Sequence, residues 1–239
     1  MSNALEEIQT LAKFYDLQLR NKFGSDAVAA GGKLFLGKYY AASDKIFFGL
    51  NPGTYKAGNR NPFDVELRPD NGPWGHRTSR FPYWRNCTCF FDSSTHLSSW
   101  IADVTSTFLI PWRSCNLAEL RRQHNLAEQI YKYSGSLIRK MIEHHCAKIL
   151  IVAGVESLRI LASADFLNFP LNDRTIAYRF DGTSSYNGPR GIYQWRKVVH
   201  QELVVYQVPH FSRASNEKAL ADCALWLEQN ILSRRVRER

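Results

Sequence analysis

The chain has 239 residues and a net charge of +9; its length allows one large α/β domain or two small ones, and its apolar content is enough for a substantial core. It contains no apolar run of 18 residues, which argues against a transmembrane helix, and its positive charge favours a polyanionic partner. The acidic, amphipathic N-terminus is unlike a secretory signal. Five cysteines without a framework pattern fit a reducing compartment, so we expect a cytoplasmic protein.

Apolar periodicity predicts the elements in chain order. An amphipathic helix is expected at about 4–20 and a buried strand at 45–50, followed by a long irregular loop at about 54–99 that is rich in Arg and aromatic residues. Further strands are predicted at 104–112, 147–154 and 202–210. The intervening helices are predicted at 117–123, 126–145 (with Gly135 as a candidate break) and 155–166. Residues 165–200 favour loops with short strands or hairpins, and a last helix precedes a basic tail at 233–239.

Four apolar strands separated by helices indicate a three-layer α/β/α fold around a mainly parallel, four-stranded sheet. No repeat or linker divides the chain, so we predict a single domain over residues 1–239. Ligands of such folds bind beyond the carboxyl ends of the strands. Three segments directly follow predicted strands and should share that edge: 51–53, 112–114 and 210–213.

Two short motifs at this edge carry a family resemblance. "GLNPG" (49–53) follows the first predicted strand, and "PHFSR" (209–213) follows the last. Together they resemble the uracil-DNA glycosylase superfamily, and most closely its single-strand-selective monofunctional and thymine/mismatch glycosylase branches. The second motif of that family commonly has Pro where this chain has Phe211. The resemblance implies a uracil-DNA-glycosylase-like fold over about residues 45–215.

The resemblance also implies two catalytic residues. Asn51 would hold the water that attacks the sugar C1′, because an amide both donates and accepts hydrogen bonds. His210 would donate a hydrogen bond to the departing base and stabilise the charge that forms in the transition state. Without the resemblance, Asn-Pro-Gly is also a good turn, and His210 is also a satisfied histidine at a strand end.

Further residues are expected around the base. Phe63 would stack on the extruded base, although it suits a core position equally well. Gly53 leaves open the space that a bulky aromatic fills in the strictly uracil-specific branch. Uracil-reading relatives usually carry an Asn in the second strand, where this chain has Thr107 and Phe108. The expected target is therefore a pyrimidine: uracil or, in preference, a base enlarged at C5. The complete predicted pocket is Gly49, Leu50, Pro52, Gly53, Tyr55, Phe63, Thr107 and Phe108.

Basic side chains among the loop aromatics suit a nucleic-acid groove, although a solvated loop with an aromatic mini-core remains the alternative. Ser212 would grip a phosphate, and Arg213 would wedge into the gap left by the flipped base or bind a phosphate. The predicted DNA contacts are Ser212, Arg213, Arg60, Arg77, Arg80 and Arg113. The expected partner is single- or double-stranded DNA, with RNA left open, and no membrane. The protein would be a monomer associated with the nucleoid.

No cofactor or metal is expected. The chain has no Gly-x-Gly-x-x-Gly or Walker pattern, no zinc-ligand spacing around His144–His145, and no C-x-x-C, so the cysteines are interpreted as buried thiols rather than iron–sulfur ligands. No Lys occupies the first motif, which argues against a lyase step. The sequence thus predicts a monofunctional DNA N-glycosylase that leaves an abasic site, in repair or in defence against phage with modified DNA. The alternative is a non-catalytic nucleic-acid-binding member of the same fold.

Overall fold

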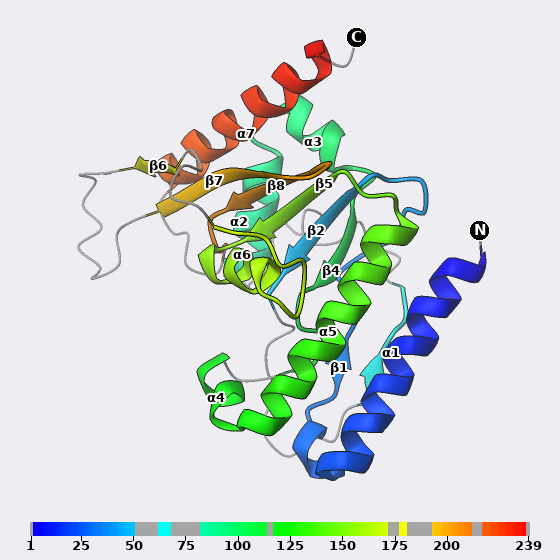
Figure 1. Cartoon of the computed structure of the whole chain (residues 1–239). Coiled ribbons are helices and arrows are strands. Elements are labelled where there is room, and N and C mark those ends of the chain that lie inside the picture. The colour runs from blue at the N-terminus through cyan, green and yellow to red at the C-terminus, as the bar shows by residue number, and fades with distance from the viewer. Residues whose placement is uncertain are drawn as a thin grey trace.

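The computed structural model describes residues 2–50, 62–67, 82–113, 117–171, 177–180, 193–211 and 217–237. Its helices are α1 (Ser2–Phe23), the short 3-10 helix η1 (Ser25–Val28), α2 (Pro82–Phe91), α3 (Thr95–Ile101), α4 (Leu117–Arg122), α5 (His124–His144), α6 (Val155–Ala162) and α7 (Glu217–Arg237). Its strands are β1 (Gly32–Lys33), β2 (Lys45–Gly49), β3 (Phe63–Asp64), β4 (Thr105–Phe108), β5 (Ile149–Ala153), β6 (Ala177–Phe180), β7 (Tyr193–His200) and β8 (Leu203–Val208). Figure 1 shows their arrangement.

The main sheet has six strands in the order β4-β2-β5-β8-β7-β6, and β1 and β3 form a separate two-stranded sheet. Strands β4, β2, β5 and β8 are parallel, whereas β7 and β6 add an antiparallel extension beyond β8. The α/β class and the mainly parallel sheet are therefore confirmed, but the predicted number of four strands is wrong by two. The extension was hard to recognise because β7 buries Trp195 on one face and Val198 on the other, which hides the alternation typical of a half-buried strand.

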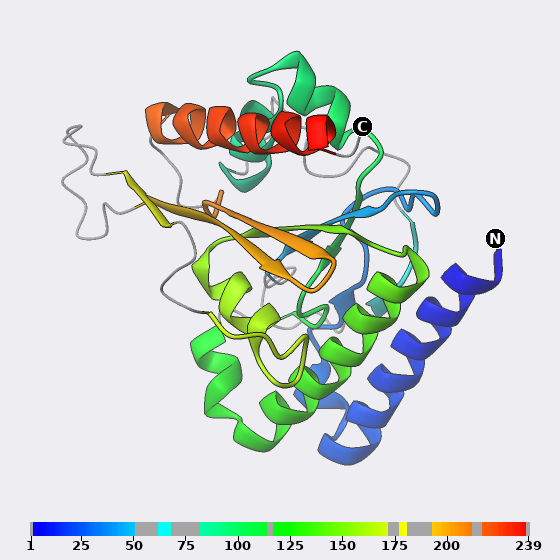
Figure 2. The same cartoon turned by 45° about the horizontal axis from the view of Figure 1, so that its top comes forward.

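Helices cover both faces of the sheet. Helices α1, α5 and α6 pack on the face that carries Ile46, Phe48 and Leu150. Helices α2, α3 and α7 pack on the opposite face, which carries Phe47 and Ile151. Figure 2 shows the sheet between these two layers, with α7 in red above it and α5 and α1 below it. Side chains of both β2 and β5 are buried in both layers, as their continuous apolar sequences predict.

The predicted irregular loop at 54–99 contains two helices, and this is the largest local difference from the sequence prediction. Helix α2 buries Cys87, Phe90 and Phe91, which are spaced i, i+3 and i+4 and so form one apolar stripe against the sheet. Helix α3 begins at the N-cap Ser94, whose hydroxyl accepts a hydrogen bond from the Leu97 backbone N–H. The Gly-rich and Pro-rich residues that precede α2 concealed this short helical pattern.

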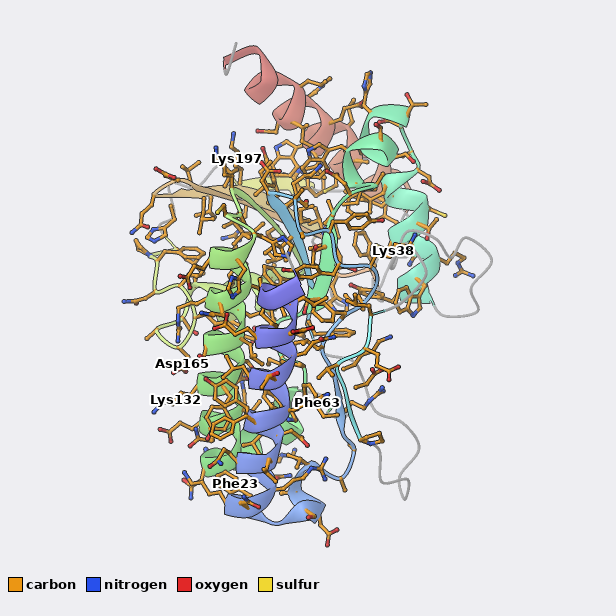
Figure 3. The ribbon with its side chains drawn as sticks, turned by 90° about the vertical axis from the view of Figure 1, so that its right-hand side faces the viewer. Phe23, Lys38, Phe63, Lys132, Asp165 and Lys197 are labelled. Atoms are coloured by element: carbon orange, nitrogen blue, oxygen red, sulfur yellow. The ribbon has the colours of Figure 1, made fainter. Side chains whose placement is uncertain are left out.

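Two smaller expectations also differ. Gly135 does not break α5; instead it allows close packing, because a Cβ there would lie 1.8 Å from the Asp165 carbonyl oxygen. Arg139 of α5 donates a hydrogen bond to the Phe166 carbonyl at 2.8 Å, so α5 holds the segment that follows α6. Figure 3 shows Asp165 of this segment beside α5. The residues predicted as a basic tail from 233 continue α7 as far as Arg237.

Helix α1 extends the predicted 4–20 helix by about one turn and packs along α5. The rings of Tyr15 and Tyr133 stack with centroids 4.1 Å apart, and Lys140 pairs with Glu7 at 2.9 Å. Figures 1 and 3 show the two helices side by side. In the described part of the chain, no helix has the length and apolar content needed to cross a membrane.

Candidate functional site

The order of the sheet defines where its winding direction reverses. From β2 the chain crosses to β4 on one side, and it then returns to β5 on the other side of β2. Such a reversal opens a crevice between the carboxyl ends of the two central strands, which is where open α/β sheets bind their ligands. In this protein the crevice position lies between the ends of β2 and β5.

Strand β2 brings the first motif to this position. The Leu109 and Ile110 backbone N–H groups donate to the Gly49 and Leu50 carbonyls at 2.8 and 2.9 Å, so the backbone is held up to the residue before Asn51. A Cβ at Gly49 would lie 3.1 Å from Leu36 Cδ1 and 3.2 Å from Phe108 Cδ1. Gly49 therefore serves close packing. The remaining first-motif predictions, Asn51, Pro52, Gly53 and Tyr55, lie outside the described residues.

Strand β4 contributes packing rather than an open pocket wall. Thr107 is fully buried, and its hydroxyl donates to the Leu34 carbonyl at 2.5 Å. Phe108 is 7% exposed and belongs to the core layer under α2. The residues predicted to contact the base at these two positions are thus side chains of the packed interior. The one proton of the Thr107 hydroxyl is already donated to Leu34.

Phe63 lies on β3, beside the residues that follow β4. Its ring covers Gly32, where a Cβ would lie 2.4 Å from Phe63 Cδ2, and it contacts the Trp112 ring with centroids 5.2 Å apart. Trp112 Nε1 in turn donates to Asp16 Oδ1 at 3.1 Å. Phe63 is partly exposed, and Figure 3 shows it beside α1. Phe63 therefore packs against the core, and part of its side chain stays exposed to solvent.

His210 follows β8 and is half-buried. Gly154, the residue after β5, has φ +95°, and a Cβ there would lie 3.0 Å from His210 Cβ. On its other side, the His210 ring meets the Tyr83 ring of α2 edge to face, with centroids 5.8 Å apart. His210 is consequently held between the end of β5 and the first turn of α2.

Phe211, which stands where the second motif of the resembling family commonly has Pro, is tightly packed. It is fully buried, and its ring lies 5.3 Å from Phe90 and 6.4 Å from Phe47. Asn86 Nδ2 donates to the Phe211 carbonyl at 2.8 Å. Aromatic packing and this hydrogen bond fix the backbone immediately after His210. The DNA-contact predictions Ser212, Arg213, Arg60, Arg77 and Arg80 lie outside the described residues.

Arginines border the same edge. Arg113 follows β4, is partly exposed, and donates its backbone N–H to the Gly31 carbonyl at 3.0 Å. Arg121 of α4 pairs with Glu156 in the first turn of α6, and this hydrogen bond raises the pKa of the Arg121 guanidinium. Arg159 lies 3.6 Å from the same carboxylate. The pair of Arg121 with Glu156 joins α4 to the helix that follows β5, whereas Arg159 and Glu156 both belong to that helix.

Three residues around His210 were missed by sequence reasoning: Tyr83, Asn86 and Gly154. A signal existed for Tyr83, because it precedes Cys87 by one helical turn on the stripe that continues to Phe90 and Phe91. Gly154 could have been identified as the residue that joins an apolar strand directly to a helix. The contact of both residues with His210 depends on packing between segments far apart in the sequence.

No group of three or more His, Cys, Asp or Glu side chains within the described ranges is placed to hold a metal ion. Cys87 and Cys223 are buried, and burial raises the pKa of both thiols well above the ordinary value. Cys89 and Cys146 are exposed, so the interpretation of the cysteines as buried thiols is wrong for these two. Cys115 lies outside the described residues.

Comparison with known proteins gave no assignment: no protein-family model matches the chain, and no curated protein matches it at a significant level.

Proposed function

We propose that this protein is a monofunctional DNA glycosylase with a uracil-DNA-glycosylase-like fold. The observation that carries the proposal is the convergence of both motif-bearing segments on the topological switch point. Leu50, the residue before Asn51, directly follows β2, which is the neighbour of β5 in the sheet. His210 lies against Gly154 at the end of β5. This is the position at which a doubly wound sheet binds its ligand.

The spacing of the strands suits a flat substrate. Strand β5 lies between β2 and β8, and neighbouring strands are about 4.8 Å apart, so the two motif-bearing strands are separated by about 10 Å. Side chains that approach from such a distance can hold a planar ring between them. A base inserted there would have Asn51 on one side and His210 on the other.

The proposed reaction is hydrolysis of the N-glycosidic bond. Water held by the Asn51 amide adds to the sugar C1′ as the bond from C1′ to the base nitrogen breaks. The bonding electrons leave with the base, and a hydrogen bond from His210 stabilises the negative charge that develops on it. The water loses a proton, the base is eventually protonated, and the sugar is left as an abasic site.

The preferred substrate would be a pyrimidine with a substituent at C5. Discrimination for plain uracil requires buried hydrogen-bond partners for the base edge. At the second-strand position that provides such an amide in uracil-reading relatives, Thr107 already donates its hydroxyl proton to Leu34, and Phe108 is packed in the core. Gly53 would leave room beside C5. The partner would be DNA, attracted by the net charge of +9 and contacted by the arginines of the long loop.

We place the protein in the cytoplasm, acting as a monomer on DNA in the nucleoid. The biological setting that best suits a C5-enlarged base is defence against phage with hypermodified DNA. Excision of such a base would leave abasic sites in the invading genome but not in a host genome that lacks the modification.

Labelled oligonucleotides test this proposal. They should contain uracil, 5-hydroxymethyluracil, a thymine mismatch or glucosylated 5-hydroxymethylcytosine, in single- and double-stranded form. After incubation with the protein, alkali converts abasic sites into strand breaks. We expect breaks with at least one C5-substituted base, and about 10³-fold fewer with Asn51→Ala, within the range for loss of a group that activates water.

The alternative, a DNA-binding protein without catalysis, predicts a different result. It requires salt-sensitive binding to the oligonucleotides with no alkali-sensitive sites on any base, and that outcome would refute the glycosylase proposal. Strand breaks that persist in Asn51→Ala would instead refute the role assigned to Asn51. Binding alone would not discriminate, because both functions require it.

A further inference from the structure

The contacts of His210 point to a role for helix α2 that the sequence motifs do not contain. The His210 side chain contacts both a backbone and an aromatic ring, namely Gly154 at the end of β5 and Tyr83 in α2. Gly154 has φ +95°, a region that strongly favours glycine, and the absent Cβ leaves the space that His210 occupies. His210 can therefore approach the end of β5 this closely only because position 154 is glycine.

Tyr83 provides the second side. Its ring lies 5.8 Å from the His210 ring at an interplanar angle of 60°, an edge-to-face geometry that aromatic pairs favour. The Tyr83 hydroxyl oxygen is buried and finds no hydrogen-bond partner among the residues that the structure describes, and burial raises the pKa of this phenol well above its ordinary value. The contact between Tyr83 and His210 is made by the two rings.

Helix α2 also holds the backbone beside His210. Asn86 lies three residues after Tyr83, and it donates to the Phe211 carbonyl at 2.8 Å. The Tyr83 ring contacts Phe211 as well, with centroids 5.9 Å apart. Two successive residues of the second motif are thus bound by one face of α2, first through a ring and then through an amide.

We propose, on the basis of the glycosylase function above, that Tyr83 is a positioning residue that orients the His210 imidazole toward the departing base, with Asn86 fixing the adjacent backbone. A donor contributes to catalysis only when its N–H points at the atom on which charge develops. Misplacement of a reacting group by about 1 Å can reduce a rate about 100-fold. The contacts of His210 with the Tyr83 ring and with Gly154 limit such displacement.

Two measurements on three variants test this role. Tyr83→Leu removes the ring, Tyr83→Phe keeps the ring and removes the hydroxyl, and Phe90→Leu is the matched control in the same aromatic cluster around Phe211. The first measurement is the NMR chemical shift of the His210 Cε1 proton in the free protein, assigned by its loss in His210→Gln. The second is kcat and KM for excision of a base from an oligonucleotide on which the wild-type protein is active.

For Tyr83→Leu we expect a shifted His210 resonance and a kcat reduced about tenfold or more, with KM within about twofold, because orientation is lost rather than DNA binding. Tyr83→Phe should retain both wild-type values. Phe90→Leu should lower stability through lost packing and leave the His210 resonance in place. Asn86→Ala provides a second variant if Tyr83→Leu does not fold, and it should also shift the resonance.

An unchanged His210 resonance and kcat in Tyr83→Leu would overturn the proposal, as would an equal change in Phe90→Leu. If the wild-type protein excises a base from none of the oligonucleotides, the glycosylase function fails, but the resonance in the free protein still decides whether Tyr83 sets the position of His210. Failure of the function and failure of the positioning role are thereby distinguished.

Discussion

The two edges of the parallel sheet use their polar residues differently. At the amino edge, the buried Lys45 donates from Nζ to the Trp100 carbonyl at 2.9 Å and pairs with Asp103, and the buried His145 places Nδ1 3.1 Å from the Ser43 carbonyl. At the carboxyl edge, His210 is half-buried beside the start of α2. These polar residues of the amino edge are buried and bound to other parts of the protein, whereas His210 at the carboxyl edge keeps part of its surface exposed.

This comparison teaches that a polar residue at a strand end is informative only together with its partners. Lys45 and His210 both lie at the ends of apolar strands, but Lys45 is buried whereas His210 is half-buried. The comparison therefore makes opposite predictions for the two edges. Substitutions at the carboxyl edge should reduce activity more than stability, and substitutions at the amino edge should do the reverse.

After Asn51→Ala, the largest effect is expected for His210. Replacing it with Ala should reduce formation of abasic sites by about 100-fold, in the range found when one donor to a developing charge is removed. The free energy of unfolding should change by less than about 1 kcal/mol, because the imidazole is half-buried. Single-turnover kinetics and urea denaturation measure the two quantities. A large loss of stability with unchanged activity would place His210 with the structural residues of the amino edge.

At the amino edge, Lys45→Ala should destabilise the fold by about 2 kcal/mol. The Trp100 carbonyl loses its charged donor, and the buried side-chain stem leaves a space. Asp103 is partly solvated, so the loss of its partner adds little. Urea denaturation checks the stability, and the activity per folded molecule should stay at the wild-type level. Reduced activity per folded molecule of Lys45→Ala would contradict the assignment of the amino edge to stability alone.

A smaller effect is expected from His145. Burial, and secondarily the neighbouring His144, lowers its pKa, against an opposing contribution from the hydrogen bond with Ser43. The unfolded chain then binds the proton more readily than the folded protein does. The contribution of neutral His145 to the free energy of unfolding is fully present above the ordinary histidine pKa of about 6.5. It is lost as the pH falls toward the lowered pKa of His145 in the folded protein.

His145→Gln should therefore reduce the pH dependence of stability between neutral and mildly acidic conditions. Denaturation midpoints at several pH values compare the variant with the wild type, and His200→Gln is a control at a half-buried histidine of β7. Equal pH slopes for the wild type and His145→Gln would show that His145 does not titrate on unfolding.

The sequence predicted the parallel part of the fold well because β2, β5 and β8 are continuous apolar runs with clear ends. It predicted the helices poorly where aromatic and cysteine residues replace the usual helix formers, as in α2. For residues 165–200 the sequence predicts only loops with short strands or hairpins, and it does not define β6 and β7. Trp195 and Val198 of β7 face opposite layers, so the strand shows no simple alternation of buried and exposed residues. Such a pattern differs little from that of an aromatic loop.

The site was predicted in part. The parallel-strand rule identified the edge that carries Leu50 and His210, because it depends only on where strands end. The burial of Thr107 and Phe108 and the contact of Tyr83 with His210 were not predictable, because they depend on packing between segments distant in the sequence. Phe63 remained ambiguous for the same reason, and its partly exposed ring now allows both interpretations.

The central claim is that the ligand binds at the carboxyl edge, between the ends of β2 and β5. Titration of ¹⁵N-labelled protein with a short single-stranded oligonucleotide, followed by amide NMR, tests it most directly and does not depend on turnover. We predict the largest shifts at Gly49, Leu50, Gly154 and His210, and small shifts at Lys45 and His145. Shifts concentrated at the amino edge or along α1 and α5, with the carboxyl edge unchanged, would contradict the account.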